Sequence, residues 1–224
     1  MTTLITGAGR GIGRGLADGF AALGPVIATH RGTPPAGSHP GLEWQALDVT
    51  APDSSPDSPR ALGSRLTGRP IDLLVCNAGV YLGKGLALDD LKPDLWAQTF
   101  AVNVTGVFRT IQALLPNLAK GRTPRIAIIS SRMGSDSIAA GGALIYRSSK
   151  AAVLNLGRNL ATDLSPRGIA VGIYHPGWVK TDMGGEGAHI DLDTSVSGLM
   201  ARFAELSLAD TGCFRNHDGS TLPF

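Results

Sequence analysis

The chain contains 224 residues, of which 43% are hydrophobic, and its 20 lysines and arginines against 18 aspartates and glutamates leave a net charge of +2. This length suits one domain with a sizeable core and is short for two. The small charge, with arginines scattered along the chain, disfavours a nucleic-acid-binding protein, and no apolar run approaches the roughly 20 residues that span a bilayer. Because no signal peptide is recognisable, we expect a cytoplasmic protein without nucleic-acid or membrane partners.

Short apolar runs alternate with longer helical patterns along the chain. Strands are predicted over residues 3–6, 26–29, 42–47, 71–76, 125–129 and 169–174, with a short last strand near 213–215. Helices are predicted near residues 11–23, 94–119, 143–164 and 194–209, with a short helix at 60–66 after a proline-rich stretch. This alternation predicts an α/β fold, a three-layer doubly wound parallel sheet in a single domain over residues 1–224.

Neither the cysteines nor the histidines indicate a metal site. Cys76 falls in an apolar predicted strand and lies far from Cys213 in the sequence, which favours a buried, reduced thiol. The five histidines, at positions 30, 39, 175, 189 and 217, show no ligand-like spacing with one another or with the cysteines. We expect no metal.

The first turn is rich in glycine and lies between a predicted strand and a predicted helix. Glycines let the backbone approach a pyrophosphate closely, and the free N–H groups and positive end of the following helix favour that anion. The pattern therefore predicts a dinucleotide site of the Rossmann type, with a plain tight turn as the alternative. The residues expected to contact the nucleotide are Gly7, Gly9, Arg10, Gly11, Ile12 and Gly13.

Tyr146 and Lys150 stand four residues apart in a predicted helix, so both side chains leave the same helical face. An ammonium beside a phenol favours the phenolate, and we expect Lys150 to lower the pKa of Tyr146 from about 10 toward neutrality. Such a phenol is a candidate acid/base catalyst. The alternative is an exposed stacking pair without a catalytic function.

Six separated motifs together resemble the short-chain dehydrogenase/reductase family, and the resemblance covers almost the whole chain. They are the glycine turn from Gly7 to Gly13, Asn77-Ala78-Gly79, Asn103 in Asn-Val-Thr-Gly, Ser130-Ser131, the Tyr146 and Lys150 pair, and His175-Pro176-Gly177. The stretch Ser-Ser-Arg-Met-Gly-Ser at 130–135 and the residues after His175 are similar to the C-factor/sniffer-like carbonyl reductase branch. The resemblance implies an oxidoreductase with a nicotinamide cofactor.

The resemblance assigns four catalytic residues, Asn103, Ser131, Tyr146 and Lys150. It implies that Tyr146 exchanges a proton with the substrate oxygen, that Ser131 orients this oxygen, and that Lys150 stabilises the phenolate and holds the nicotinamide ribose. It gives Asn103 a water-mediated link to the lysine, with a satisfied structural amide as the alternative. Ser131 precedes Tyr146 by 15 residues (146 − 131), more than in most family members, so Ser135 or Ser137 is the alternative donor.

The charges after the second strand point to the type of cofactor. In this fold an acidic residue about 20 positions past the glycine turn binds the ribose of NAD, whereas an arginine accommodates the 2′-phosphate of NADP. Here the position holds His30 and Arg31, no acidic residue occurs between residues 18 and 43, and Arg10 adds a second cation. We therefore predict NADPH or NADP+ in preference to NADH, unless both arginines are merely solvated.

Further cofactor contacts are implied by the resemblance. Asp48, after the third strand, resembles the family's adenine-contacting aspartate, with a helix cap as an equal alternative. The other expected contacts are Val49, Asn77, Ala78, Gly79, Tyr146, Lys150, Pro176, Gly177, Val179 and Thr181. On this assignment the cofactor half covers about residues 1–125 and the catalytic and substrate half about residues 126–224.

These observations predict an NADP(H)-dependent oxidoreductase that transfers hydride between nicotinamide and a small or medium-sized carbonyl or alcohol substrate. Trp178, Met183 and residues 184–190 resemble the family's substrate lid. Two alternatives stay open, a 3-oxoacyl-carrier-protein reductase and a noncatalytic NADP-binding regulatory or signalling protein on the same fold. Relatives include homodimers, homotetramers and monomers, so the oligomeric state also stays open.

Overall fold

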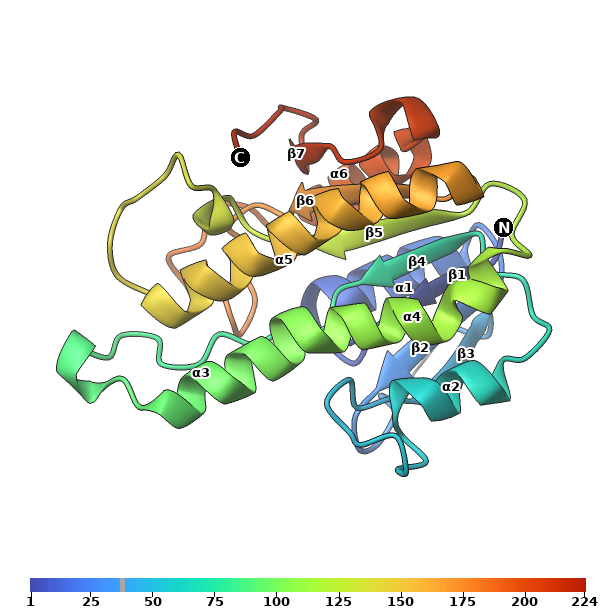
Figure 1. Cartoon of the computed structure of the whole chain (residues 1–224), viewed down its shortest axis with the longest axis horizontal. Helices are drawn as coiled ribbons and strands as arrows, with labels where there is room; N and C mark the ends of the chain where they lie inside the picture. The colour runs from blue at the N-terminus through green and yellow to red at the C-terminus, as the bar shows by residue number, and fades with distance from the viewer. Residues whose placement is uncertain (37–38) are drawn as a thin grey trace.

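The computed structural model describes residues 1–36 and 39–224 (Figure 1). Its strands form one parallel sheet in the order β3-β2-β1-β4-β5-β6-β7. Their bounds are β1 (Thr3–Ile5), β2 (Val26–His30), β3 (Leu42–Ala46), β4 (Leu73–Cys76), β5 (Arg125–Ile129), β6 (Ala170–His175) and β7 (Phe214–Asn216). The strand order reverses direction between β1 and β4, and ligands bind at such a switch point in open parallel sheets.

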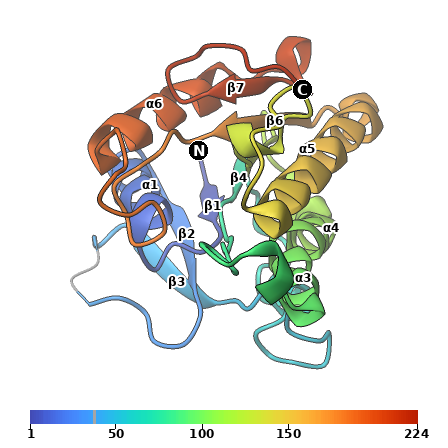
Figure 2. The ribbon, with the colours of Figure 1, turned by 90° about the vertical axis from the view of Figure 1, so that its left-hand side faces the viewer.

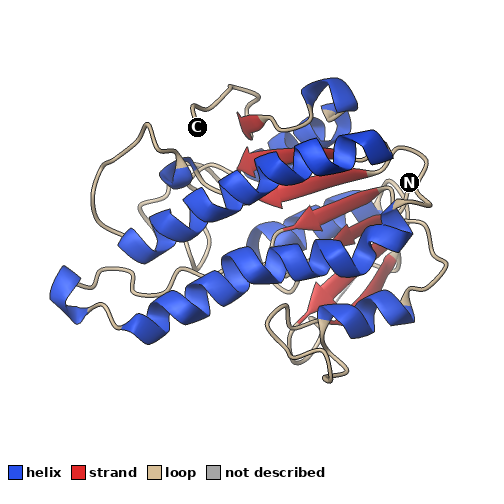
Figure 3. Cartoon of the chain, in the orientation of Figure 1, coloured by secondary structure: helices blue, strands red, loops and turns tan. Residues whose placement is uncertain are grey.

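Helices cover both faces of the sheet. They are α1 (Gly11–Ala21), α2 (Pro59–Arg65), α3 (Pro93–Phe100), α4 (Gly106–Leu118), α5 (Leu144–Leu164) and α6 (Leu192–Glu205). In Figure 2, α1 and α6 lie on one side of the sheet and α3, α4 and α5 on the other. Figure 3 shows the strands as the middle layer between helices. The predicted fold class, a three-layer doubly wound parallel sheet, is therefore confirmed.

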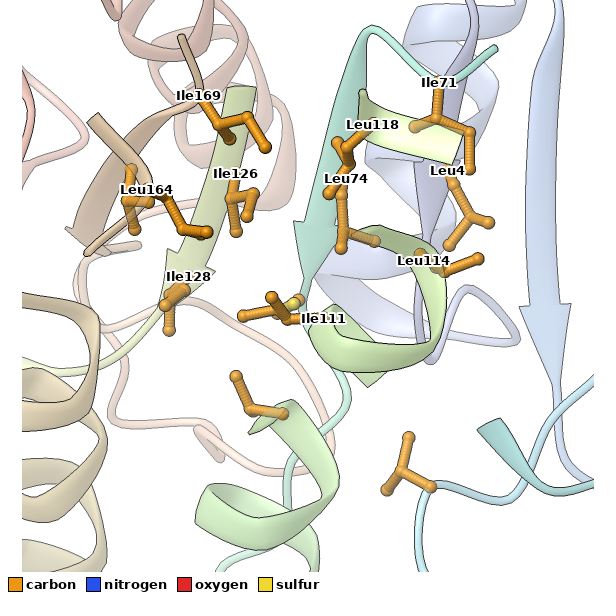
Figure 4. Close-up of a cluster of buried hydrophobic side chains, with 14 of the residues drawn as sticks. Leu4, Ile71, Leu74, Ile111, Leu114, Leu118, Ile126, Ile128, Leu164 and Ile169 are labelled. Atoms are coloured by element: carbon orange, nitrogen blue, oxygen red, sulfur yellow. The ribbon is translucent and has the colours of Figure 1, made fainter. Parts of the chain in front are cut away.

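Successive residues of the central strands pack on opposite faces of the sheet. In β4, Leu74 and Cys76 join the cluster formed with α2, α4 and α5, whereas Leu73 and Val75 join the cluster formed with α1 and α6. Figure 4 shows the first cluster, with Leu74 near Leu118 of α4. Because both faces are covered, the strands read as continuous apolar runs. The predicted burial of Cys76 is confirmed, since its residue is 2% exposed.

Most observed bounds differ from the predicted ones by a few residues, and two differences have a clear physical cause. The predicted helix 94–119 is a continuous helical run over residues 93–118, in which a π turn at Ala101–Thr105 lies between α3 and α4. The predicted strand 71–76 begins only at residue 73. Its first two residues instead bind neighbouring segments: the Ile71 N–H donates to the carbonyl oxygen of Asn117 near the end of α4, and the Asp72 carboxylate accepts from two backbone N–H groups.

Within the part of the chain that the structure describes, none of the helices has the length and apolar character that a membrane span requires. The same residues contain no group of three or more His, Cys, Asp or Glu side chains arranged to hold a metal ion.

The core analysis leads to a stability prediction. Leu74 is 0% exposed in the central strand. Leu74→Ala would leave a cavity under α4, so we expect the free energy of unfolding to fall by about 2–5 kcal/mol. Leu23 is 69% exposed, and Leu23→Ala is the matched control, with an expected change within about 0.5 kcal/mol. Urea unfolding measures both; equal losses would contradict the assignment of Leu74 to the core.

Candidate active site

Six loops and one helix meet at the carboxyl edge of the sheet. The loops follow β1 to β6, and the N-terminal part of α5 extends past the same edge (Figure 1). Residues from these segments line a cavity of about 490 Å³. The cavity lies where the strand order reverses, which is the expected position of a ligand crevice in this architecture.

Two glycines let the loop after β1 pack tightly against the loop after β4. A Cβ atom on Gly13 would lie 2.4 Å from Asn77 Nδ2, and one on Gly7 would lie 2.9 Å from Ala78 Cα. The Asn77 amide donates to the carbonyl oxygens of Thr6 and Gly7 at 3.0 and 3.1 Å. Asn77 therefore braces the glycine turn, and its loop is more than a plain turn.

The start of α1 suits a bound phosphate group. The helix begins at Gly11, its N-cap residue Arg10 makes no side-chain cap, and Gly9 has open space where a Cβ would stand. The first N–H groups of the helix thus lack a side-chain partner, while Arg10, Arg31 and Lys180 add positive charge to the cavity wall. Because a dinucleotide carries a pyrophosphate, and NADP a further 2′-phosphate, the residues present fit such a cofactor.

Most residues predicted to bind the cofactor line this cavity. They are Gly7, Arg10, Gly11, Ile12, Gly13, Arg31, Asp48, Val49, Asn77, Ala78, Gly79, Tyr146, Lys150, Pro176 and Thr181. The wall does not include Gly9, His30, Gly177 or Val179, nor the predicted catalytic residues Asn103 and Ser131. It does include Ser130, Lys180 and Asp182, which the sequence analysis did not assign to the cofactor.

The two residues where β2 ends have different surroundings. His30 is buried, and its ring lies edge-on to Trp44 with 5.9 Å between ring centroids, whereas Arg31 lines the cavity. Asp48 Oδ1 accepts hydrogen bonds from the N–H and hydroxyl of Thr50 at 2.8 and 2.7 Å. Burial raises the pKa of Asp48, but these bonds and the charge of Arg31 lower it overall. Asp48 is therefore an anion held by a Thr50 turn, not by a helix end.

Tyr146, Lys150 and Ser131 converge beside the end of β5. The Lys150 ammonium lies 5.6 Å from the centre of the Tyr146 ring and donates to the Ile129 carbonyl oxygen at 2.9 Å. The Ser131 hydroxyl, whose Oγ accepts from the Met133 N–H at 3.1 Å, lies near the Tyr146 hydroxyl and acts to lower the pKa of this phenol. Ser130 points elsewhere, because its hydroxyl donates to the Lys150 carbonyl oxygen at 3.0 Å. The geometry thus pairs the phenol with the second serine, the one that the family pattern favours.

Burial, and not the charge of Lys150, controls the pKa of Tyr146. Burial raises the pKa of the phenol to about 12, and the neighbouring Ser131 hydroxyl only partly offsets this effect. Burial also lowers the pKa of Lys150 to about 8, because a charged group loses hydration there. The expectation that Lys150 draws the pKa of Tyr146 toward neutrality is therefore wrong. The phenol carries its proton at neutral pH, which is the form that a proton donor needs.

The amide of Asn103 joins two segments of the site. It lies in the π turn, where its Oδ1 accepts from the Val80 N–H at 2.8 Å and its Nδ2 donates to the Val80 carbonyl oxygen at 2.9 Å and to Ser149 Oγ at 3.0 Å. Ser149 in turn donates to the Tyr146 carbonyl oxygen at 2.8 Å. Asn103 is therefore a satisfied buried amide that fixes α5 to the loop after β4. The water-mediated link to Lys150 stays a prediction.

Arg147 folds the long stretch between Ser131 and Tyr146 onto α5. Its guanidinium donates to three carbonyl oxygens of this stretch, those of Gly141 and Ile138 at 3.1 Å and of Met133 at 3.5 Å. Residues 141–143 all have positive φ angles, of 70°, 63° and 50°, and Ala143 in this run is not a glycine. The chain thus reverses sharply before α5, and the extra residues bulge outward while Ser131 reaches Tyr146.

The two alternative serines have other surroundings. Ser135 is buried, and its hydroxyl has no hydrogen-bond partner among the described residues. The Ser137 hydroxyl donates to the Phe224 carbonyl oxygen at 2.8 Å. Of the three serines, Ser131 is the one that acts on the pKa of Tyr146. The longer separation therefore does not displace Ser131.

Tyr81 belongs to the site although the sequence analysis did not single it out. Its ring stacks on that of Tyr146, with 4.3 Å between centroids and 16° between planes. Lys84 lies 5.8 Å from the centre of the Tyr81 ring and donates to the Met183 carbonyl oxygen at 3.0 Å. Tyr81 follows the Asn-Ala-Gly motif by two residues, a signal that it stands at the carboxyl edge. The contact of Lys84 with Met183 joins residues 99 positions apart and has no sequence signal.

Comparison with known proteins reveals relatives along the whole chain. The family model for short chain dehydrogenase matches residues 1–189. C-signal of Myxococcus xanthus is 40% identical over 168 residues, which cover 74% of this chain and 99% of that protein. The NADPH-bound carbonyl reductase from chicken fatty liver is 33% identical with a TM-score of 0.87, covering 100% of this chain and 98% of that one. Carbonyl reductase Sniffer of D. melanogaster is 28% identical with a TM-score of 0.89, and the match covers 100% of this chain and 99% of that one.

The buried Lys150 ammonium should cost stability in a pH-dependent way. Its pKa falls from 10.5 to about 8 on burial, so below about pH 8 both the folded and the unfolded protein carry the proton and the full cost applies. As the pH rises from about 8 to 10.5, the folded protein loses the proton first and gains stability relative to the unfolded chain. We therefore expect cofactor-free Lys150→Met to be more stable than the wild type at neutral pH, by at most about 3 kcal/mol.

This stability difference should shrink as the pH rises from 8. Urea unfolding at several pH values measures it, and Lys120→Met, which removes an exposed lysine, is the matched control. A wild-type advantage over Lys150→Met that is the same at every pH would contradict the buried-charge interpretation.

The Arg147 contacts predict the behaviour of the loop that they hold. Arg147→Met removes three charge-assisted hydrogen bonds, so we expect amide hydrogen exchange in residues 132–142 to accelerate more than about tenfold. Exposed Arg167 offers the matched control, Arg167→Met, which should leave exchange in this segment unchanged. Exchange rates that are equal in both variants would rule out Arg147 as the clamp.

Proposed function

The chain belongs to the short-chain dehydrogenase/reductase family, in its C-factor/sniffer-like carbonyl reductase branch, and we propose that it is an NADP(H)-dependent reductase of small or medium-sized carbonyl compounds. One observation carries the proposal. A protonated phenol, a serine hydroxyl and a buried ammonium meet beside the cavity that the glycine turn lines. These are the groups that a carbonyl needs when it is reduced next to a bound dinucleotide.

Tyr146 is the proton donor in this proposal. Its pKa near 12 keeps the phenol protonated across the neutral range, ready to protonate the oxygen of a carbonyl that gains negative charge during reduction. Ser131, whose hydroxyl lies near the phenol, donates to the same oxygen and orients it. When bound, reduced nicotinamide supplies the hydride. The ammonium of Lys150, 5.6 Å from the ring, stabilises the phenolate that remains.

The protonated state of Tyr146 favours reduction over alcohol oxidation. A donor is present in the resting protein, whereas oxidation needs the phenolate as a base, and the raised pKa makes that form scarce. Tyr81 packs on one face of the Tyr146 ring and keeps water from it. The surroundings of Tyr146 therefore support carbonyl reduction as the direction of the reaction.

NADP(H) is proposed as the cofactor from the charges of the cavity. Arg10 and Arg31 both line it, and a guanidinium binds a phosphate through two parallel hydrogen bonds. Residue 30, where NAD-binding relatives of this fold carry a carboxylate, is a buried histidine packed on Trp44. The chicken carbonyl reductase with the same fold is NADPH-bound, which supports the assignment.

A noncatalytic signalling protein is the second candidate function, because the relative from Myxococcus xanthus is named C-signal. A protein that only binds NADP would have no need of a serine hydroxyl beside a protonated tyrosine, or of a buried lysine that costs stability. The retention of this arrangement favours the enzyme. Absence of turnover with every carbonyl tested would favour the signalling protein.

The proposal predicts a large loss of activity when the phenolic hydroxyl is removed. We expect Tyr146→Phe to lower kcat/KM by about 10²- to 10⁴-fold, the usual contribution of a general acid. Oxidation of NADPH and NADH is followed by absorbance with a panel of aldehydes, ketones, diones and quinones. Binding of NADPH by the variant, measured by calorimetry, shows that the protein is folded and the cavity intact.

Tyr81→Phe is the matched control, since it removes the neighbouring hydroxyl and keeps the ring stack. Its kcat/KM should stay within a few-fold of the wild-type value, because Tyr81 is not the proton donor. If Tyr146→Phe kept full activity, or if Tyr81→Phe lost as much as Tyr146→Phe, the assignment of the proton donor would be wrong.

A further inference from the structure

An ion pair joins the glycine turn to the substrate lid. Arg10 Nη1 lies 3.0 Å from Asp182 Oδ2, although the two residues stand 172 positions apart in the chain. Both residues line the cofactor cavity, and their side chains are 79% and 80% exposed. The ion pair therefore lies at the solvent-facing rim of the cavity and not in its interior.

The guanidinium in this ion pair is one that the proposed function directs to the 2′-phosphate of NADP(H). Arg10 has no other side-chain hydrogen bond or ion pair within residues 1–36 and 39–224. Its guanidinium can bind both anions at once only if the Asp182 carboxylate and the phosphate come within a few ångströms of each other, where their negative charges repel. Asp182 and the 2′-phosphate are therefore competitors for one cation.

The lid has a second cationic attachment on its other side. The residue after Asp182 is Met183, and the Met183 carbonyl oxygen accepts a hydrogen bond from Lys84 at 3.0 Å. The lid is thus fastened by Arg10 from the loop after β1 and by Lys84 from the loop after β4. Contacts between exposed charged groups contribute little free energy, so a ligand that binds Arg10 better than Asp182 does can release the first of them.

We propose that Asp182 sets the discrimination between NADP(H) and NAD(H) by competing with the 2′-phosphate for Arg10. This inference rests on the proposed function and extends it to the selectivity and closure of the same site. In the free protein Asp182 holds Arg10 and the lid together. NADP(H) draws Arg10 to its phosphate and loosens this attachment, whereas NAD(H), which lacks the phosphate, leaves the ion pair in place.

Binding measurements without turnover test the competition. Dissociation constants for NADP+ and NAD+ are measured by calorimetry for the wild type, Asp182→Asn and Glu186→Gln. Glu186 is an exposed carboxylate of the same lid that does not line the cavity, so its variant controls for the change in net charge. We expect Asp182→Asn to bind NADP+ roughly two- to fivefold more tightly than the wild type, with the affinity for NAD+ unchanged.

A double mutant separates competition for Arg10 from simple repulsion. In an Arg10→Gln background there is no guanidinium to compete for, so Asp182→Asn should no longer tighten NADP+ binding. A gain that persists in this background would mean that Asp182 acts on the phosphate directly and would overturn the inference. Equal tightening for NADP+ and NAD+, or the same gain from Glu186→Gln, would overturn it as well.

These outcomes are distinguishable from failure of the proposed function. Wild-type protein that binds NADP+ but shows no change in Asp182→Asn refutes the competition and leaves the proposed reductase intact. Wild-type protein that binds neither cofactor refutes both proposals together. Binding of NADP+ without any carbonyl turnover refutes the reductase. The role of Asp182 is then still decided by the dissociation constants for NADP+ and NAD+.

Discussion

The hydrogen bond from the Lys150 ammonium to the Ile129 carbonyl oxygen is the interaction on which the site depends, because it fixes helix α5 to the end of β5. Ser130 adds a bond from its hydroxyl to the Lys150 carbonyl oxygen, and a Cβ on Gly134 would lie 2.5 Å from the Lys150 carbonyl carbon. Close packing thus holds the lysine backbone while its charge stays buried. Burial of the Lys150 ammonium costs folding free energy, but it places a positive charge where a Tyr146 phenolate would need one.

The fold followed from the sequence because its signals are local. Apolar strands alternate with amphipathic helices, and each central strand is covered on both faces, so the pattern of β4 needed no knowledge of its partners. The π turn at Asn103 was not foreseeable from periodicity. Its amide is satisfied by Val80 and Ser149, which lie on two other segments, and such long-range hydrogen bonds override the helical propensity of residues 101–105.

Sequence reasoning placed the site residues at the correct edge and misjudged one property of them. Spacing put Tyr146 and Lys150 on one helical face, but it carried no information on burial, which raises the pKa of Tyr146 against the expected direction and lowers that of Lys150. The same limit applies to His30, whose position at the end of β2 suggested a cofactor contact, whereas its buried ring packs edge-on against Trp44 on β3. Charge and spacing follow directly from the sequence, whereas the desolvation of a side chain depends on what packs around it in the folded protein.

The contacts that hold the site divide into two classes with different strengths. Those around Asn103, Ser149 and Lys150 are buried hydrogen bonds whose loss would leave polar groups unsatisfied, so they resist opening. The lid is held at Asp182 and Met183 by exposed charged side chains, which compete with water and salt. The free-energy cost of moving the lid is therefore small compared with that of moving the catalytic groups. Ligands can enter and leave past the lid while Tyr146 and its neighbours keep their geometry.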